Sequence, residues 1–362
     1  MSSVVVSSIF ESTLSDIQDP YLGRDLMAAG VVKGVEVKDS EIIISLRFGY
    51  RISAEHSKKL SDIIIDRLLP HANGKLIRIG IDWKINTHLA QAGLKGIAGI
   101  RNIIAVASGK GGVGKSTVAL NLALSLQREG ARVGILDADI YGPSQPLMLG
   151  INERPILRED KRLSPVLKYD LQTMSIGYLV DEAAAMIWRG PMVSSALQQL
   201  LGETAWDDLD YLIVDLPPGT GDIQLTLAQK IPVSGVVVVT TPQEMALLDA
   251  RKAIVMFQKL DMAVLGVVEN MSAYRCTHCG HAENIFGFEG GEKLSRQFGV
   301  PLLGRLPLDI RIREQSDLGV PLVINDPSGL ITTDYCEIAR RVSAALSLRP
   351  RDYRLSFTTK SV

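Results

Sequence analysis

The stretch from Gly109 to Thr117, GKGGVGKST, has the residue types and the spacing of a phosphate-binding loop. It fits the pattern G-x-x-x-x-G-K-[ST], in which glycines let backbone N–H groups wrap closely around phosphate oxygens. We expect Lys115 to reach the β and γ phosphates of ATP and the Ser116 hydroxyl to bind magnesium. The predicted nucleotide-binding residues of the loop are Gly109, Lys110, Gly111, Gly112, Val113, Gly114, Lys115, Ser116 and Thr117.

Lys110 is a second lysine in this loop, at a position where the general pattern allows almost any residue. It cannot easily serve the phosphates that Lys115 already neutralises. It would have a use if it reached a nucleotide held by a second subunit, as a trans-acting arginine does in phosphoryl transfer. The alternative is a solvated loop lysine, and the spacing alone does not decide between the two.

Acidic residues follow two apolar stretches further along the chain. Asp137 and Asp139 come after Val133 to Leu136, and Asp215 comes after Tyr211 to Val214. An acid at the end of a buried strand is the usual second element of a phosphate-loop enzyme, because it holds magnesium directly or through water. A single one could be a helix cap, but three near one phosphate loop favour a catalytic site. The turn-rich LPPGTGD that follows Asp215 could sense the γ phosphate.

Alternating strands and helices must position these groups. From Asn102 onward the pattern predicts an α/β domain, a P-loop NTPase fold with a mostly parallel sheet and helices on both faces. Short apolar runs are typical of strands buried on both faces. A helix is expected from about Ser116 to Glu129, with Gly130 as its stop. The expected strands are Ile103 to Ala107, Val133 to Leu136, Tyr211 to Val214, Val236 to Thr240, Ala263 to Val268 and Leu302 to Leu303.

Asn270 and Pro307 follow the last two of these strands, at the edge where a purine would rest. Asn270 could read the exocyclic amine of adenine, although an asparagine there could also cap a turn.

Residues 1–90 are predicted to form a small α+β domain. A Gly-rich linker over 91–101 is expected to join it to the α/β domain. The larger domain then covers 102–350, and 351–362 form a C-terminal tail. No catalytic set is recognisable in the small domain, and His56 and His71 are expected at its surface. Its expected helices are Ile9 to Ile17 and Ala54 to Leu69, and its expected strands Val31 to Val37, Glu41 to Leu46 and Leu76 to Ile81.

Composition limits the class of protein. The chain has 362 residues, 46% of them hydrophobic, and a net charge of -1. Since both signs are interspersed, there is no electrostatic case for a nucleic-acid or a membrane partner. Mean hydropathy is +0.16, but the apolar runs are too short to span a membrane. Three cysteines are too few for a disulfide framework, and MSSVVVSSIF lacks the features of a secretory signal, so we expect a cytoplasmic protein.

Cys276 and Cys279 stand in a CxxC motif, with His278 and His281 nearby. A disulfide is disfavoured in a reducing compartment. A thioredoxin-type pair needs its second cysteine to enter a helix, whereas Gly280 suggests a loop. Zinc and an iron-sulfur cluster both want four ligands, of which one CxxC supplies half. Two ligands per chain therefore imply a site shared by two chains. A third cysteine, Cys336, is expected to lie on a helix and in the core of the protein.

Several motifs together resemble the Mrp/ApbC iron-sulfur cluster carrier ATPases, which are MinD-like proteins with a deviant Walker A motif. The resemblance covers about residues 102–350. The small domain is similar to the iron-sulfur-assembly domain often fused to bacterial members, with DPYLGRDL as the best match. The motifs that carry the resemblance of the larger domain are SGKGGVGKST, DADIYGPS, DLPPGTGD, ENMS, CTHCGH, IFGFEGG and LGRLPLDIRIREQSDLGVP.

The resemblance implies a homodimer that binds ATP between its subunits and hydrolyses it, and a slow ATPase is expected. It implies a labile four-iron four-sulfur cluster held between paired CxxC motifs at Cys276 and Cys279, received from cluster donors and passed to apoproteins. Residue roles carry over as follows: Lys110 is the signature lysine that reaches the partner's nucleotide, Lys115 the phosphate-loop lysine, Ser116 the magnesium ligand, Asp139 the acid that orients water, Asp215 the Walker B acid, and Asn270 and Pro307 the adenine-side residues.

Two positions depart from the family's pattern. Its usual proline inside the CxxC is Thr277 in this chain, and the Cys-Pro of related small domains is replaced by RISAEHS. A docking role is therefore expected for the small domain rather than a cluster role. Two alternatives stay open for the whole chain. One is a MinD-like regulator, which would need an amphipathic membrane-binding tail, and the other is a zinc-stapled nucleotide-binding scaffold.

Overall fold

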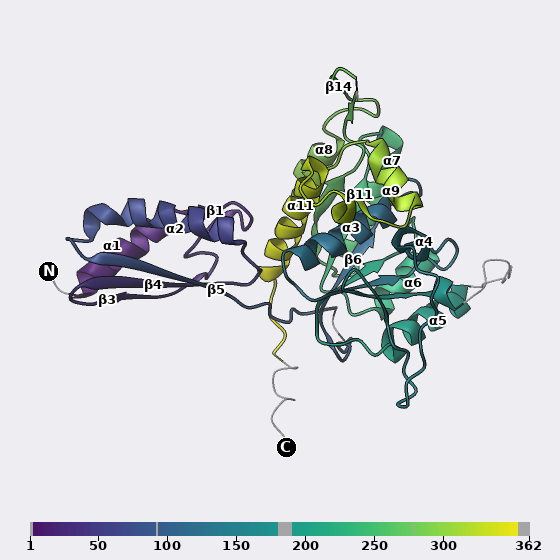
Figure 1. Cartoon of the computed structure of the whole chain (residues 1–362), viewed down its shortest axis with the longest axis horizontal. Helices are drawn as coiled ribbons and strands as arrows, with labels where there is room; N and C mark the ends of the chain where they lie inside the picture. Colours follow the sequence, from purple (N-terminus) through teal and green to yellow (C-terminus); the bar gives the residue numbers. More distant parts are fainter. Residues whose placement is uncertain (1–2, 92, 180–189, 277, 354–362) are drawn as a thin grey trace. The chain divides into compact units, whose positions relative to one another are not determined.

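The computed structural model describes residues 3–91, 93–179, 190–276 and 278–353 (Figure 1). The chain folds into two compact units. The first contains the residues up to Asn86 together with Ser343–Pro350, and the second contains Thr87–Val342 and the residues from Arg351 onward.

The first unit packs two helices on one face of a three-stranded sheet. The central strand pairs antiparallel with one neighbour and parallel with the other, in the order β3-β4-β5. Ile42, Ile44 and Leu46 alternate along the central strand and are buried, because side chains of a strand point alternately to its two faces. The elements of this unit are α1 Ser3–Ser15, β1 Gln18–Asp19, β2 Arg24–Asp25, β3 Val32–Val37, β4 Glu41–Phe48, α2 Ala54–Leu68, the 3-10 helix Leu69–His71, and β5 Leu76–Trp83.

A buried carboxylate holds the DPYLGRDL turn of the first unit together. The side chain of Asp19 is fully buried and accepts hydrogen bonds from the N–H groups of Tyr21 and Leu22, at 2.9 and 2.8 Å. It also accepts from Tyr50 Oη, at 2.9 Å, and lies 3.1 Å from His56 Nε2. The expectation that His56 lies at the surface was wrong, since its side chain is only 14% exposed. Its partner Asp19 lies 37 residues away in the sequence, so no local pattern could reveal this contact. His71 is exposed, as expected.

The second unit is built on an eight-stranded sheet of order β15-β12-β11-β6-β10-β7-β9-β8. All neighbouring pairs are parallel except β8 with β9, and β10 and β11 are buried along their whole length. The strands of the second unit are β6 Ile100–Ala107, β7 Val133–Asp137, β8 Val166–Lys168, β9 Leu171–Ser175, β10 Leu209–Asp215, β11 Gly235–Thr240, β12 Val264–Glu269, β13 Tyr274–Arg275, β14 Ala282–Glu283 and β15 Leu302–Arg305.

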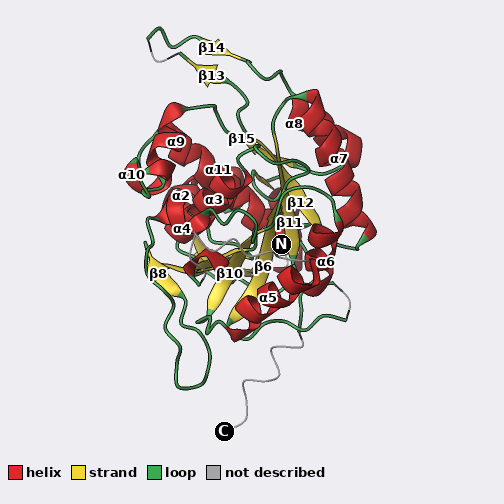
Figure 2. Cartoon of the chain, turned by 90° about the vertical axis from the view of Figure 1, so that its right-hand side faces the viewer, coloured by secondary structure: helices red, strands yellow, loops and turns green. Residues whose placement is uncertain are grey.

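Helices lie on both sides of this sheet (Figure 2). The predicted α/β architecture is therefore confirmed, and each of the six predicted strands is present. None of the helices in the described ranges combines the length and the apolar character needed to cross a lipid bilayer. The helices are α3 Lys115–Arg128, α4 Gln145–Leu149, the 3-10 helix Ile176–Tyr178, α5 Gly190–Glu203, α6 Asp222–Lys230, α7 Glu244–Lys259, α8 Gly290–Phe298, α9 Ile310–Asp317, α10 Leu322–Asn325 and α11 Leu330–Ser347, whose last residues belong to the first unit.

The Asp19 cluster generates a prediction for acid stability. Burial raises the pKa of Asp19, but the bonds from His56, the Leu22 and Tyr21 N–H groups and Tyr50 outweigh burial and hold it below its ordinary value. A depressed pKa adds stability that is complete above the unfolded-state pKa of about 3.9 and is lost as the pH falls through the folded-state pKa.

We therefore expect Asp19→Asn to lower the stability of the first unit by roughly 3 kcal/mol at pH 7, because one of the two oxygens that accept buried hydrogen bonds becomes an NH2 donor. It should also weaken the dependence of stability on pH below about pH 4. Hydrogen exchange of peptides from residues 9–86 measures both effects. The exposed Asp16 supplies the control Asp16→Asn, and equal protection in the two variants would contradict the prediction.

Candidate functional site

The phosphate-binding loop joins the carboxyl end of β6 to the amino end of α3. Gly112 and Gly114 adopt positive φ angles of 80° and 79°, which glycine reaches without steric cost. A Cβ on Gly109 would meet the backbone of Asp249 at 2.2 Å, so this glycine lets the loop pack against α7. The loop thus has the strand, turn and helix context that confirms the motif, with the positive end of the α3 dipole at its end.

Lys115 and Asp215 form a buried ion pair beneath the loop. Lys115 is 6% exposed and Asp215 is fully buried. Lys115 Nζ donates to Asp215 Oδ1 and, at 3.1 Å, to Ser116 Oγ. Lys115, Ser116 and Asp215, which the sequence predicted as phosphate-loop lysine, magnesium ligand and Walker B acid, therefore lie together.

Asp137 organises the segment that carries Asp139. Its carboxylate is fully buried and accepts hydrogen bonds from the N–H groups of Asp139, Ser144 and Gln145 and from Ser175 Oγ, at 3.0 to 3.2 Å. Burial and the nearby charge of Asp215 raise the pKa of Asp137 to about 7, against the opposing effect of the N–H donors. Asp137 therefore fixes the course of the loop from inside.

Asp139 is the partly buried acid of this loop, two residues further on. Burial is the largest effect on the pKa of Asp139 and raises it, against the lowering effects of Lys115 and of the N–H groups of Gly142 and Tyr141. Asp137 is the register partner of Asp215, which bonds Lys115, and the Asp139 N–H donates to Asp137, so the three predicted carboxylates lie in one region beside the phosphate loop.

Gln145 is a residue of this site that the sequence patterns did not reveal. It is 1% exposed, and its Nε2 donates to Asp215 Oδ2 at 2.9 Å and to the Ser116 carbonyl oxygen at 3.2 Å. Its Oε1 is buried without a hydrogen-bond partner. In the sequence Gln145 is marked only by its position six residues after Asp139, and that spacing indicates no chemistry.

The donor set fits a magnesium ion. A hydroxyl and carboxylates are the oxygen ligands that magnesium prefers, and an amide oxygen without a partner stands among them. Ser116, with Asp215 directly or through water, would hold the ion. When bound, it would neutralise charge on the phosphates.

Asn270 and Pro307 follow β12 and β15, which are neighbouring strands of the sheet. Glu269 of β12 pairs with Arg305 of β15, so the residues that follow emerge side by side. Asn270 is 6% exposed and its Nδ2 donates to the Val113 carbonyl oxygen at 2.9 Å, while Pro307 is half-buried. Asn270 thus contacts the phosphate loop itself, and its predicted contact with adenine remains a prediction.

Cys276 and Cys279 lie at the tip of a hairpin formed by β13 and β14, which projects past α8 and α9 (Figure 2). Cys276 is partly exposed and Cys279 is exposed. The turn is closed by Cys276 N–H donating to the His281 carbonyl and Gly280 N–H donating to the Cys276 carbonyl, both at 2.9 Å. The N–H groups of Cys279 and His278 also lower the pKa of the Cys276 thiol, which favours the thiolate.

The hairpin is a loop, as predicted, and not the start of a helix. Thr277 lies outside the described residues. Among the residues that are described, no group of three or more His, Cys, Asp or Glu side chains could hold a metal ion. Cys336 is buried, as expected. The CxxC therefore supplies at most half of a four-ligand site.

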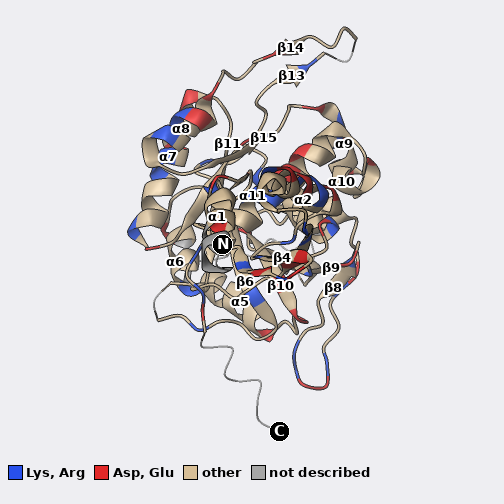
Figure 3. Ribbon diagram, turned by 90° about the vertical axis from the view of Figure 1, so that its left-hand side faces the viewer, with Lys and Arg blue, Asp and Glu red and all other residues tan. Residues whose placement is uncertain are grey.

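Two surface features complete the description of the second unit. Lys110 is exposed at the phosphate loop, and its carbonyl accepts from Ser108 Oγ at 2.9 Å. Charges of both signs alternate on α7 and α8, where Lys293 faces Glu244 at 3.8 Å (Figure 3). No stripe of one sign marks these helices.

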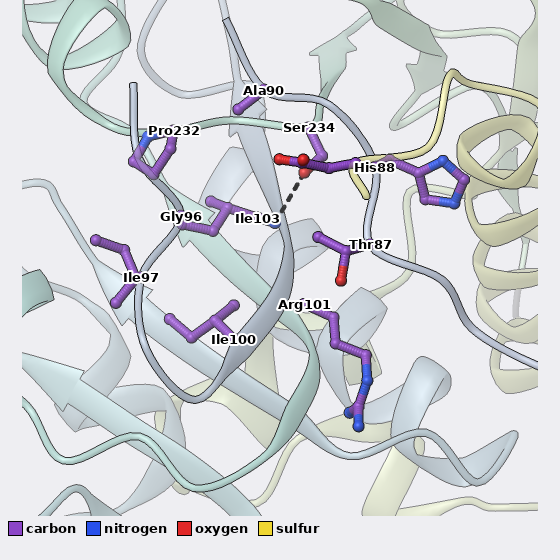
Figure 4. Close-up of a pocket in the computed structure, with 11 residues that line it drawn as sticks. Thr87, His88, Ala90, Gly96, Ile97, Ile100, Arg101, Ile103, Pro232 and Ser234 are labelled. Carbon is purple, nitrogen blue, oxygen red and sulfur yellow. Dashed lines mark hydrogen bonds between the residues drawn. The ribbon is translucent and has the colours of Figure 1, made fainter. Parts of the chain in front are cut away.

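A separate hollow lies at the amino end of β6, whereas the phosphate loop follows its carboxyl end (Figure 4). Ile97, Ile100 and Ile103 contribute apolar side chains to it, and Ser234 Oγ accepts from the Ile103 N–H at 3.4 Å. Gln91 fixes the segment before it, bonding the Ala228 carbonyl and the Val233 N–H. None of the residues that line this hollow belongs to the nucleotide site.

Comparison with known families finds two matches. Residues 99–343 match a family described as NUBPL iron-transfer P-loop NTPase, and residues 11–55 match one described as iron-sulfur cluster assembly protein. An iron-sulfur cluster carrier protein of Escherichia coli K12 is 48% identical over 354 residues, covering 95% of this chain and 94% of that protein. One from Haemophilus influenzae is 49% identical over 339 residues, covering 93% and 91%.

Solved structures agree with the fold. A nucleotide-binding protein of Archaeoglobus fulgidus in complex with ADP is 37% identical, with a TM-score of 0.56, and covers 66% of this chain and 91% of its own. The cell division ATPase MinD of Pyrococcus furiosus is 23% identical, with a TM-score of 0.51 over 67% and 98% of the chains, which supports the fold alone.

The geometry of Gly114 generates a prediction for the protein without nucleotide. A Cβ there would lie 2.3 Å from Asn270 Nδ2, at a φ angle of 79°. Gly114→Ala should therefore cost about 2 to 4 kcal/mol and lower the thermal midpoint by roughly 4 to 10 °C. Gly111 is the matched control, because a Cβ there meets only Pro218 Cγ at 3.9 Å. Equal midpoints for Gly114→Ala and Gly111→Ala would show that the loop is not held as described.

Proposed function

The chain belongs to the NUBPL iron-transfer P-loop NTPases, and from this membership we propose that it is an ATP-hydrolysing carrier that holds an iron-sulfur cluster and passes it to apoproteins. One observation supports the proposal above all. The phosphate loop follows β6, and the CxxC hairpin follows β12, two places away in the same parallel sheet. The carboxyl ends of parallel strands meet at one edge, so nucleotide and cargo share a rigid frame.

The cargo site supports a homodimer. Each hairpin presents two thiols at an accessible tip, whereas a cluster wants four thiolate ligands. Two copies of Cys276 and Cys279 would supply four, which matches a four-iron four-sulfur cluster. Exposed thiols at a hairpin tip also suit exchange, because donors and apoproteins can approach them. Such thiols stay reduced in a cytoplasm, which is where we place the protein.

The hydrolytic site would act by positioning and charge neutralisation, since phosphoryl transfer asks little covalent chemistry of the protein. Lys115 would leave Asp215 to bind the β and γ phosphates. Asp139 would orient the attacking water, and the exposed Lys110 would reach the nucleotide of the second copy. A site that is complete only in the dimer explains why turnover should be slow in the isolated chain.

The trans role of Lys110 can be tested by Lys110→Ala. We expect the ATPase rate to fall roughly a thousandfold, as for trans-acting arginines, while ATP affinity changes by no more than about threefold. Lys230, exposed at the end of α6, supplies the control Lys230→Ala. Mixing Lys110→Ala with Asp139→Ala chains should restore one working site per mixed dimer. An ATPase rate unchanged in Lys110→Ala would remove the trans role.

The cargo can be tested by anaerobic reconstitution with iron and sulfide. The full chain should become brown and bind about four iron and four sulfide per two chains, and Cys276→Ala should bind neither while keeping its affinity for ATP. Cys336→Ala, at a buried cysteine, should behave like the unchanged chain. A colourless protein that binds zinc would favour the scaffold alternative, and ATP-dependent co-sedimentation with liposomes would favour a MinD-like regulator.

A further inference from the structure

Gln145 touches all three segments that form the nucleotide site. Its backbone N–H donates to Asp137 Oδ2 at 3.1 Å, which ties it to the loop of Asp139. Its side-chain Nε2 donates to Asp215 Oδ2 at 2.9 Å and to the carbonyl of Ser116 at 3.2 Å. Of its two polar side-chain atoms, Oε1 lacks a hydrogen-bond partner and is buried.

The two oxygens of Asp215 are held by different donors. Lys115 Nζ bonds Oδ1 and Gln145 Nε2 bonds Oδ2. Lys115 must give up this bond when it moves to the phosphates of a nucleotide. Gln145 carries no charge and has no such competing demand. It therefore remains as the side chain that can keep the carboxylate of Asp215 oriented while ATP is bound.

The free oxygen of Gln145 points to a second task. A buried amide oxygen without a hydrogen bond costs free energy, so a partner that arrives with the nucleotide would be stabilising. Magnesium in nucleotide sites usually keeps several of its waters, and their O–H groups are donors of the required kind. Oε1 belongs to the side chain that already bonds the carboxylate of Asp215 and the backbone carbonyl of Ser116, the two residues proposed to hold the ion.

We propose that Gln145 is a positioning residue of the magnesium site, which orients Asp215 through Nε2 and accepts a hydrogen bond from a magnesium-bound water through Oε1. This inference rests on the proposed ATPase function. It makes Gln145 responsible for the affinity of the site for magnesium, and not for the affinity for the nucleotide itself. Those two affinities can be measured separately.

The test uses the full chain and a fluorescent, non-hydrolysable ATP analogue, titrated with magnesium and, separately, bound in EDTA. Gln145→Met keeps the length of the side chain and removes both hydrogen-bonding atoms. We expect the magnesium concentration for half-saturation to rise roughly tenfold or more, equivalent to about 1.4 kcal/mol, with affinity in EDTA within twofold of the unchanged chain. Gln145→Leu should behave alike, which guards against a fault of one replacement.

Gln172, in β9 of the same unit, supplies the control. Its side chain bonds the carbonyl and the N–H of Asp207, both at 2.9 Å, away from the nucleotide site. Gln172→Met should leave the magnesium titration unchanged, and the thermal midpoint of each variant without nucleotide reports any loss of packing. A magnesium half-saturation within twofold of the unchanged chain in both Gln145 variants would overturn the inference, as would an equal loss of affinity in EDTA. Failure of the unchanged chain to bind the analogue at all would instead overturn the proposed function.

Discussion

The second unit depends on charge buried at the end of its central strands. Lys115, Asp137 and Asp215 are all at most 6% exposed, within one small region at the carboxyl ends of β6, β7 and β10. Burying one cation and two acids costs free energy unless each is paired or hydrogen-bonded. Even a paired buried ion such as Lys115 with Asp215 is weak evidence for stability. The structure meets the cost with donors: Lys115 and Gln145 on Asp215, and N–H groups on Asp137. An arrangement of this kind is expected where charge must be ready for a ligand, because a hydrophobic replacement would give an equally stable core.

The parallel sheet explains why these groups meet although they are far apart in the sequence. Asp215 pairs in register with Asp137 of β7 and with Val106 of β6, so the loops after three strands open at one level. Parallel pairing between β10 and both neighbours then fixes the separations of the side chains more firmly than any loop could. A glycine in β7 leaves room for a side chain of the neighbouring strand β10, since a Cβ on Gly134 would lie 2.7 Å from Leu209 Cδ1. The geometry of the candidate site is therefore largely a consequence of register, and the loops complete it.

Much of this could be predicted, for identifiable reasons. Strands buried on both faces give short apolar runs, so β6, β10 and β11 stand out in the sequence, and the phosphate loop has its own spacing. β8 and β9 are three and five residues long, with polar residues in β9, and carry no comparable pattern. The partners of His56 and Gln145 are set by tertiary packing, as Asp19 lies 37 residues from His56 and Asp215 lies 70 residues from Gln145. A sequence pattern within a window of 20 residues cannot contain such pairs.

The cargo hairpin combines a fixed base with an accessible tip. At its base, Asn270 N–H donates to the Thr240 carbonyl, Asn270 Nδ2 to the Val113 carbonyl and Leu308 N–H to the Ala273 carbonyl, so the chain is held on both sides before Cys276. At its tip, Cys279 is exposed. A closed four-ligand cage within one chain would retain a metal as a structural site does. Half a cage on a fixed base loses little conformational freedom when a second half meets it, and it can open again without unfolding the chain. In the proposed dimer, release of cargo would require only the separation of the two halves, which is the property that a carrier needs and a structural metal site lacks.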